Sequence, residues 1–214
     1  DDTVSGARVD TIQTLNTSDV INTAGGTDSL TAVLNAGTVQ PTLTGVETIT
    51  LSAVGSAAAT LDMDDATGYT TLVNSGSTGE LVFDDIADLA ALKIANTGQA
   101  TTFTFKDAAV AGDTTVTLTL EDVTGGIITM GGEDDGDGDI ETINIVSSGV
   151  TNTTGDIAFG ADATTVVVTG SGALDINAGA EFAKVATFDA SAATGDIDVT
   201  FADRATTSES FDVT

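Results

Sequence analysis

Short segments in which apolar and polar residues alternate recur along the chain, and each is followed by a small polar turn. Alternation with a period of two is typical of a β-strand that buries one face. The segments are Ile49–Leu51, Leu72–Asn74, Leu92–Ile94, Leu118–Leu120, Ile143–Ile145, Val166–Val168 and Ala186–Phe188. Their starts lie 20 to 26 residues apart. A period of this size indicates stacked repeats of one coil each.

A second alternating segment often follows the turn, as in Glu80–Phe83, Thr101–Phe105 and Ala173–Ile176. A unit of two strands and two turns cannot cover its own apolar face, so neighbouring units must stack and share a core. We therefore predict an all-β fold, a parallel β-solenoid with coils of about 20–26 residues. A β-sandwich built from the same strands is the alternative.

The domain organisation follows from how well each part fits the period. Residues 1–40 fit less well, so we expect an irregular first coil or junction there and one continuous solenoid domain over residues 41–214. Neither end resembles a polar cap, so we expect the chain to be cut from a longer protein or partner molecules to cover its ends. The acidic segment 84–91 is the best candidate for a short helical turn.

The composition argues against an enzyme. Cys, His and Trp are absent and Tyr69 is the only tyrosine. Disulfides, thiolate metal sites and histidine bases are therefore excluded. A β-helical enzyme that cleaves polysaccharides needs basic groups around an acidic sugar, and the chain has only five Lys and Arg residues. We predict no catalytic function, with a carbohydrate-active β-helix as the less favoured alternative.

The charge balance implies bound cations. The chain has 33 Asp and Glu residues, 5 Lys and Arg residues and a formal net charge of -28. Repulsion at this density opposes a compact state, and multivalent cations would relieve it. Nucleic acid and anionic membranes are poor partners for such a chain. No apolar run is long enough to cross a bilayer, so we expect no membrane insertion.

Three acidic segments and one turn are candidate calcium sites. In Gly131–Glu141, glycines between carboxylates permit the tight folding that brings several oxygens to one Ca²⁺ ion. Weaker candidates are the acids of LDMDD, the acids of FDDIAD and the turn Gly25–Leu30. The predicted ligands are Glu133, Asp134, Asp135, Asp137, Asp139 and Glu141, then Asp62, Asp64 and Asp65, then Asp84, Asp85 and Asp88, and finally Asp28. A solvated acidic surface is the alternative for each.

Several phrases resemble a known family. They are Gly25–Leu30, Leu43–Leu51, Asp139–Ile145 and Phe188–Gly195, and they are similar to the repeat regions of RTX-type bacterial surface-layer proteins and related type I-secreted adhesins. The resemblance implies calcium-dependent folding outside the cell and assembly into a lattice at the cell surface. The strict glycine-rich nonapeptide of that family is not intact, because Asp134 stands where its third glycine belongs.

Taken together, the pattern, the charge and the resemblance predict an extracellular structural protein of the cell surface. We expect calcium to stabilise the coils and identical subunits to self-associate into a surface layer. Any cell-surface polysaccharide would be bound through regions outside this chain. The alternative is a calcium-dependent adhesin or extender stalk, which would fold in the same way and stay monomeric.

Overall fold

The computed structural model describes residues 1–133, 140–159, 163–177, 185–200 and 212–213. These residues form short strands joined by turns. The strands are β1 Thr3–Gly6, β2 Val20–Asn22, β3 Ser29–Val39, β4 Thr42–Thr44, β5 Thr48–Asp62, β6 Ala66–Thr67, β7 Thr71–Ser75, β8 Leu81–Ile86, β9 Ala91–Ala95, β10 Thr101–Phe105, β11 Thr115–Glu121, β12 Ile128–Gly132, β13 Thr142–Ser148, β14 Thr151–Thr154, β15 Ile157–Ala158, β16 Thr165–Gly170, β17 Ala173–Asn177, β18 Thr187–Ala193, β19 Ile197–Thr200 and β20 Asp212–Val213. Within the described ranges, the one helical segment is the 3₁₀ turn η1, Asp107–Ala109.

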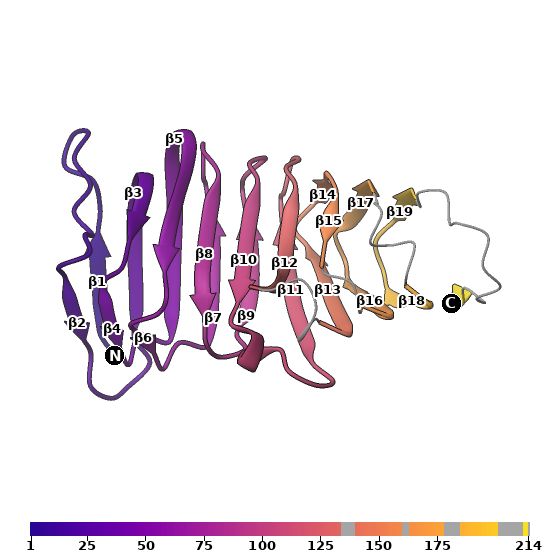
Figure 1. Ribbon diagram of the computed structural model, residues 1–214. Helices are drawn as coiled ribbons and strands as arrows, with labels where there is room; N and C mark the ends of the chain where they lie inside the picture. Colours follow the sequence, from indigo (N-terminus) through magenta and orange to yellow (C-terminus); the bar gives the residue numbers. More distant parts are fainter. Residues whose placement is uncertain (134–139, 160–162, 178–184, 201–211, 214) are drawn as a thin grey trace.

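The strands stack in parallel as a β-solenoid of about 8 turns (Figure 1). Each coil places its strands beside the strands of the coil before and the coil after, as in the ladders β3–β5, β5–β7 and β7–β9. The predicted parallel solenoid is therefore confirmed. The alternative β-sandwich is wrong, because sandwich sheets are built from antiparallel strands.

Two long walls make up most of the solenoid. The first contains β7, β9, β11, β13, β16 and β18, and the second contains β8, β10, β12 and β15. The 15-residue strand β5 belongs to both, because Thr48–Leu51 pairs with β7 and Ala59–Asp62 pairs with β8. Gly55, between these two parts, has a φ of 122° and lies where the strand changes wall. Two small sheets, β2-β4-β6 and β14-β17-β19, complete the coils.

The core consists of ladders of equivalent side chains from successive coils. One ladder is made of aliphatic residues that pair in register and are each at most 1% exposed: Leu30, Ile49, Leu72, Leu92, Leu118, Ile145 and Val168. A second ladder contains Phe83 and Phe103, whose rings stack with centroids 5.3 Å apart and planes 7° apart. Repeated stacking of similar side chains therefore builds this core.

The first 40 residues already take part in the stack. β1 pairs in parallel with β3, and β2 pairs in parallel with β4. Between β1 and β2 the chain makes a small excursion, in which Val9 and Ile12 form an antiparallel bridge. The solenoid walls thus begin before residue 41.

The helical turn expected at 84–91 is wrong. β8 continues through Ile86, and the chain turns before β9 begins at Ala91. The hydroxyl oxygen of Tyr69 accepts hydrogen bonds from the backbone N–H groups of Ala87 and Asp88, at 2.8 and 2.9 Å. Tyr69 is 4% exposed, and its burial raises the pKa of the phenol. Tyr69, a buried side chain of the preceding coil, thus fixes the conformation of this turn. The acidic residues of the segment, on which the helical prediction rested, do not indicate this contact.

Candidate functional site

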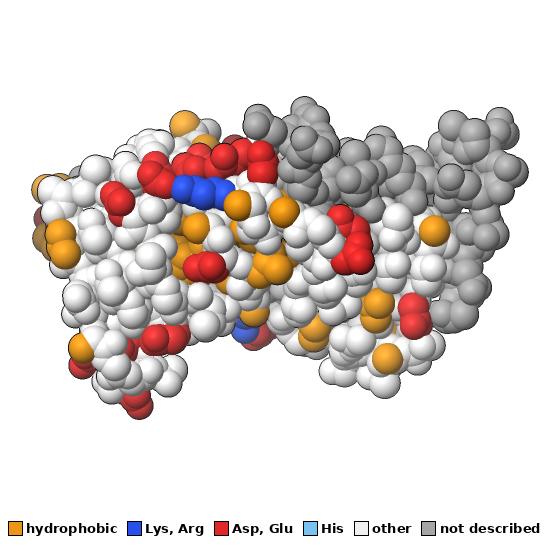
Figure 2. Space-filling model, turned by 60° about the horizontal axis from the view of Figure 1, so that its bottom comes forward, with side chains coloured by type: hydrophobic (Ala, Val, Ile, Leu, Met, Phe, Trp, Pro, Cys, Tyr) orange, Lys and Arg blue, Asp and Glu red, His pale blue; other side chains and the backbone are white. Residues whose placement is uncertain are grey.

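Acidic residues from distant parts of the chain meet where β5, β8, β10 and β12 end. These strands are neighbours in the second wall, so their last residues lie side by side. We call this region the acidic edge and define it as Asp62, Asp64, Asp84, Asp85, Asp107 and Glu133 together with Lys106. Figure 2 shows acidic side chains gathered around a basic one on this face. Two predicted segments, LDMDD and FDDIAD, and the start of a third therefore contribute to a single surface.

A β-bulge directs one of these acids outward. Asp62 lies opposite Asp84 in the ladder of β5 and β8. In the next ladder, the register shifts between Phe103 and Phe105, so that two residues of β8 stand opposite one residue of β10. Asp85 lies in this bulge with a φ of 58°, a conformation that Asp tolerates better than most residues. Bulges commonly re-aim side chains in this way.

The bulge brings Asp85 to Glu133 at the end of β12. The two carboxyl groups share a hydrogen bond, which requires a proton on one of them. This bond is the largest cause that raises the pKa of Glu133 to about 7, followed by burial and by the charge of Asp85. The nearby Lys106 acts in the opposite direction. Carboxyl groups this close hold a proton near neutral pH because a second negative charge is unfavourable there.

Lys106 supplies positive charge to the acidic edge. Its ammonium group donates a hydrogen bond to Asp64 Oδ1, and this bond raises the pKa of the lysine. The side chain of Lys106 is 32% exposed and that of Asp64 is 51% exposed, so water screens the ion pair. One lysine beside six carboxyl groups leaves the edge strongly negative. Lys106 and Asp107 lie outside the acidic segments singled out in the sequence, and only the strand order reveals their place here.

The acidic edge offers oxygen atoms suitable for binding a hard cation, but these atoms do not form a complete coordination site. Carboxylate oxygens are the ligands that Ca²⁺ prefers. Among the residues that the structure describes, however, no three acidic side chains are arranged around one point where a metal ion could be held. Binding of an ion here would therefore require the side chains to rotate toward it.

The remaining predicted ligands have other positions. Asp134, Asp135, Asp137 and Asp139 lie outside the described residues. Asp65 and Asp88 are exposed; the Asp65 carbonyl accepts the N–H of Leu43, and Asp88 belongs to the turn bound by Tyr69. These two side chains contribute to the acidic surface in general rather than to the Asp85–Glu133 pair.

Glu141 reaches back to the preceding coil. Its Oε2 accepts hydrogen bonds from the Thr114 backbone N–H at 2.5 Å and from the Thr114 hydroxyl at 3.2 Å. Glu47 does the same one residue before β5, where its Oε2 accepts the N–H of Asp28 at 2.6 Å. Sequence reasoning overlooked Glu47, although its setting Val46-Glu47-Thr48-Ile49 matches Ile140-Glu141-Thr142-Ile143. The repeated phrase thus marks an acid that joins two coils.

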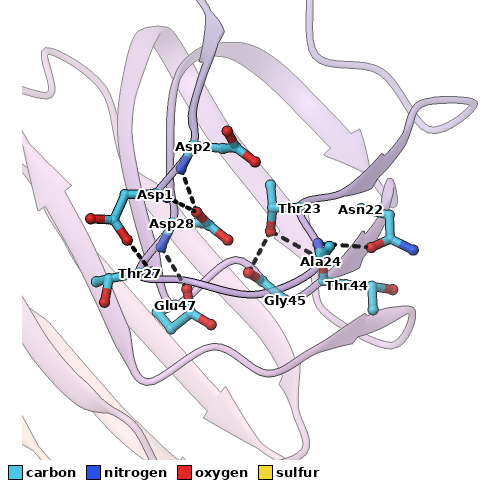
Figure 3. A network of polar contacts seen from close by, with 10 residues as sticks. All are labelled: Asp1, Asp2, Asn22, Thr23, Ala24, Thr27, Asp28, Thr44, Gly45 and Glu47. Atoms are coloured by element: carbon cyan, nitrogen blue, oxygen red, sulfur yellow. Dashed lines mark hydrogen bonds and ion pairs between the residues drawn. The ribbon is translucent and has the colours of Figure 1, made fainter.

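Asp28 is a third acid of this kind (Figure 3). Its side chain is fully buried, and its Oδ1 accepts the backbone N–H of Asp2 in the preceding coil. The ammonium group of Asp1 lies 3.9 Å from the same oxygen. Oδ2 has no hydrogen-bond partner within the structure. Because a buried carboxylate oxygen without a partner is costly, this position would gain from a bound water molecule or cation.

Comparison with known proteins adds no relative: no family model, curated protein or solved structure matches the chain. In the described part of the chain, no helix has the length and apolar character needed to cross a membrane. Fold and surface therefore define the molecule as a parallel β-solenoid with an acidic edge.

The Asp85–Glu133 pair predicts a pH dependence of stability. The pKa of Glu133 is raised to about 7 from an ordinary value of 4.5, so the folded chain binds a proton that the unfolded chain has already released between these values. The stability that this bound proton contributes to the folded chain is fully present below about pH 4.5 and is lost as the pH rises through about 7. Glu133→Gln keeps a hydrogen-bond donor without the ionisation. We expect its melting temperature to exceed that of the parent at pH 8 and to match it at about pH 4, below the ordinary pKa of the group.

The control for this measurement is Glu80→Gln, which removes one negative charge from an exposed residue at the start of β8. It should shift the melting temperature by a similar, small amount at both pH values. Thermal unfolding followed by circular dichroism compares the three proteins. Equal pH profiles for Glu133→Gln and the parent would show that the carboxyl pair does not hold a proton.

Proposed function

We propose that this chain is a structural module of a cell-surface protein, in which calcium stabilises the stacked coils and identical modules assemble into a surface layer. The observation that carries the proposal is the acidic edge, where acids from four neighbouring strands crowd around one lysine. A net charge of -28 must be compensated if copies of the chain are to pack together. Divalent cations between carboxylates of neighbouring coils or copies provide that compensation.

The architecture supports a structural role. The coils form an elongated stack with extended walls (Figure 1). Outward positions of these walls carry mostly small side chains, as in the register row Thr60, Val82, Thr102 and Thr129. Surfaces of this kind present broad, regular areas for contact with other molecules.

Among the three basic residues that the structure describes, Arg8, Lys93 and Lys106, the two lysines are engaged in ion pairs. Lys106 is paired with Asp64, and Lys93 is paired with Glu121 at 2.5 Å on the first wall. A group that deprotonates an acidic sugar must be free to face it. These pairings support the structural proposal over a carbohydrate-active one.

A calcium titration tests the proposal. We expect Ca²⁺ to raise the melting temperature, since a ligand at one hundred times its dissociation constant adds about 2.7 kcal/mol to the free energy of unfolding. We also expect particle size, followed by light scattering in the same samples, to increase with calcium and to fall again with EDTA. Magnesium at equal concentration is the control for ionic strength, because it tolerates irregular carboxylate sites poorly.

A variant locates the effect on the acidic edge. Asp85→Asn combined with Glu133→Gln keeps the shape of the pair and removes its charge, so the gain in melting temperature with calcium should shrink. Glu80→Gln should keep the full gain. Stabilisation by calcium without growth would point to the monomeric stalk, a role that the elongated stack also suits. If calcium changes neither stability nor size, the proposal is wrong.

A further inference from the structure

We infer that two copies of this chain pair side by side, each covering the outward side of the first wall of the other. This side, which we call the wall face, consists of the outward residues of β7, β9, β11, β13, β16 and β18 (Figure 1). It also includes the outward residues of the first parts of β3 and β5, Ser29–Asn35 and Thr48–Val54, which pair in register. The inference rests on the self-assembly proposed above and names the surface of its first contact.

The wall face carries very little net charge, although the chain as a whole has a formal net charge of -28. Along the described strands of the wall face, the charged outward residues are Lys93, Glu121 and Asp189, and their formal charges sum to -1. Lys93 and Glu121 form an ion pair at 2.5 Å. Two copies that meet through this face therefore bring few like charges together, whereas at the acidic edge they would oppose carboxylates to carboxylates.

The side chains of the wall face are short and stiff. One register row in the later coils consists of threonine alone: Thr115, Thr142, Thr165 and Thr187. The other outward positions are mainly Thr, Ser, Val and Ala. Ordering such side chains costs less conformational entropy than ordering Lys or Glu, and the centres of protein interfaces are depleted in charged residues. The wall face is thus well suited to burial against another molecule.

The strands of the wall face are also regularly aligned. The ladders from β5 to β16 keep an unbroken register, so their outward side chains form straight rows. Two sheets pack face to face about 10 Å apart with their strands nearly aligned, and straight rows of small side chains permit this approach. The second wall differs, because Asp62 and Asp84 lie on its outward side and its ladder is interrupted by the bulge at Asp85.

The wall face is large enough for a stable pair. It spans eight neighbouring strands. With strands about 4.8 Å apart and about six residues of 3.3 Å in each, it covers about 38 Å by 20 Å. Two copies would bury about 1,500 Å² in total, within the range of roughly 1,200–2,000 Å² that is typical of specific protein interfaces. The occupant that fits a face of this size and low charge is a second copy of the same face.

The ion pair of Lys93 and Glu121 indicates how the two copies are arranged. It joins β9 and β11, the two central strands of the wall face. A two-fold axis parallel to the strands and between β9 and β11 places β9 of each copy over β11 of the other. Lys93 of one copy then faces Glu121 of the other, and four charges of alternating sign meet. Such a contact is self-complementary and closes at two copies.

Thr117→Arg tests the pairing, because a long side chain at the centre of the wall face holds the two copies apart. Thr117 is partly exposed on β11. The matched control is Thr102→Arg, at a partly exposed outward position of β10 in the second wall. Both substitutions add the same charge to an acidic chain, so they change the general repulsion between copies equally. Melting temperatures close to that of the parent verify that both variants are folded.

Particle mass is measured by size-exclusion chromatography with light scattering, in EDTA and at high sodium chloride concentration, which screens the net charge. We expect the parent and Thr102→Arg to reach twice 21.2 kDa. Thr117→Arg should need at least about a tenfold higher concentration for the same mass, since a disrupted central contact costs more than about 1 kcal/mol. Equal association of Thr117→Arg and the parent would place the contact elsewhere and overturn the inference.

A mixing experiment tests the two-fold arrangement. Lys93→Glu has acids at both positions of the ion pair, and Glu121→Lys has bases at both. Each variant alone opposes like charges across the axis, whereas a mixture of the two opposes unlike charges at both contacts. At the lowest salt concentration at which the parent is a dimer, each variant should be monomeric and their equimolar mixture dimeric. A mixture that is no heavier than its components contradicts this arrangement.

The outcomes separate the wall contact from the proposed function. If the parent stays monomeric in EDTA at every concentration and salt level but grows in calcium, the wall contact is wrong and the calcium-dependent assembly stands. If the parent pairs in EDTA while calcium changes neither its size nor its melting temperature, the wall contact stands and the calcium-dependent assembly is wrong.

Discussion

Replacing Phe103 by Ala is expected to lower the free energy of unfolding by about 3–5 kcal/mol. Phe103 is fully buried and stacks on Phe83, with ring centroids 5.3 Å apart. In the ladder it also lies opposite Met130 of the following coil. Removal of the ring takes away contacts with two coils at once and leaves a cavity that the parallel walls cannot close. Denaturant unfolding followed by circular dichroism measures the loss.

The control for this substitution is Thr102→Ala, one residue earlier on β10, where the side chain faces outward and is partly exposed. It should cost about 1 kcal/mol or less, mainly through lower β-propensity. Similar losses for the two variants would mean that the aromatic stack does not hold these coils together.

The second large effect is expected for Gly170→Ala. A Cβ atom at this position would lie 2.0 Å from the Ser147 carbonyl oxygen of the preceding coil, and the backbone φ is 102°. The coils must therefore separate locally, in addition to the strain of a positive φ in a residue other than glycine. We expect a loss of at least about 2 kcal/mol in the free energy of unfolding.

Gly37→Ala separates these two causes. Gly37 has a φ of 116°, but a Cβ atom there would meet no atom within 4 Å. This variant should lose only about 1–2 kcal/mol, the cost of the backbone conformation. If both variants lose the same amount in urea unfolding, close approach between the coils at Gly170 makes no contribution.

The pattern of alternating residues predicted the strands and their inward faces well, but left the register open. The sequence repeat places Leu118 in line with Ile143, whereas in the structure Leu118 pairs with Ile145 and Val116 pairs with Ile143. A shift of two residues leaves every side chain on the same face of the wall. Alternation therefore cannot detect it. The register depends on the conformations of the turns, such as the φ of 53° at Asp122. The hydropathy pattern does not encode these conformations.

The candidate site was predicted residue by residue but not as one surface. Sequence reasoning treated the acids near 62, 84 and 133 as separate sites, because nothing in the local pattern says which strands end together. The strand order, with β8 between β5 and β10, decides that. The bulge at Asp85 then brings its carboxyl group to Glu133. A backbone irregularity of one residue has no hydrophobic signature, so the pair was invisible in the sequence.

The parallel stacking of coils also determines how the molecule responds to force. The hydrogen bonds between coils run along the axis, as in the ladders β11–β13 and β13–β16. Tension applied along that axis pulls directly on the hydrogen bonds between neighbouring coils, and one coil interface yields at a time. The chain would lengthen in steps of one coil and could restack when the load falls. A module of this kind behaves as an extensible element that absorbs mechanical work while its remaining coils stay folded.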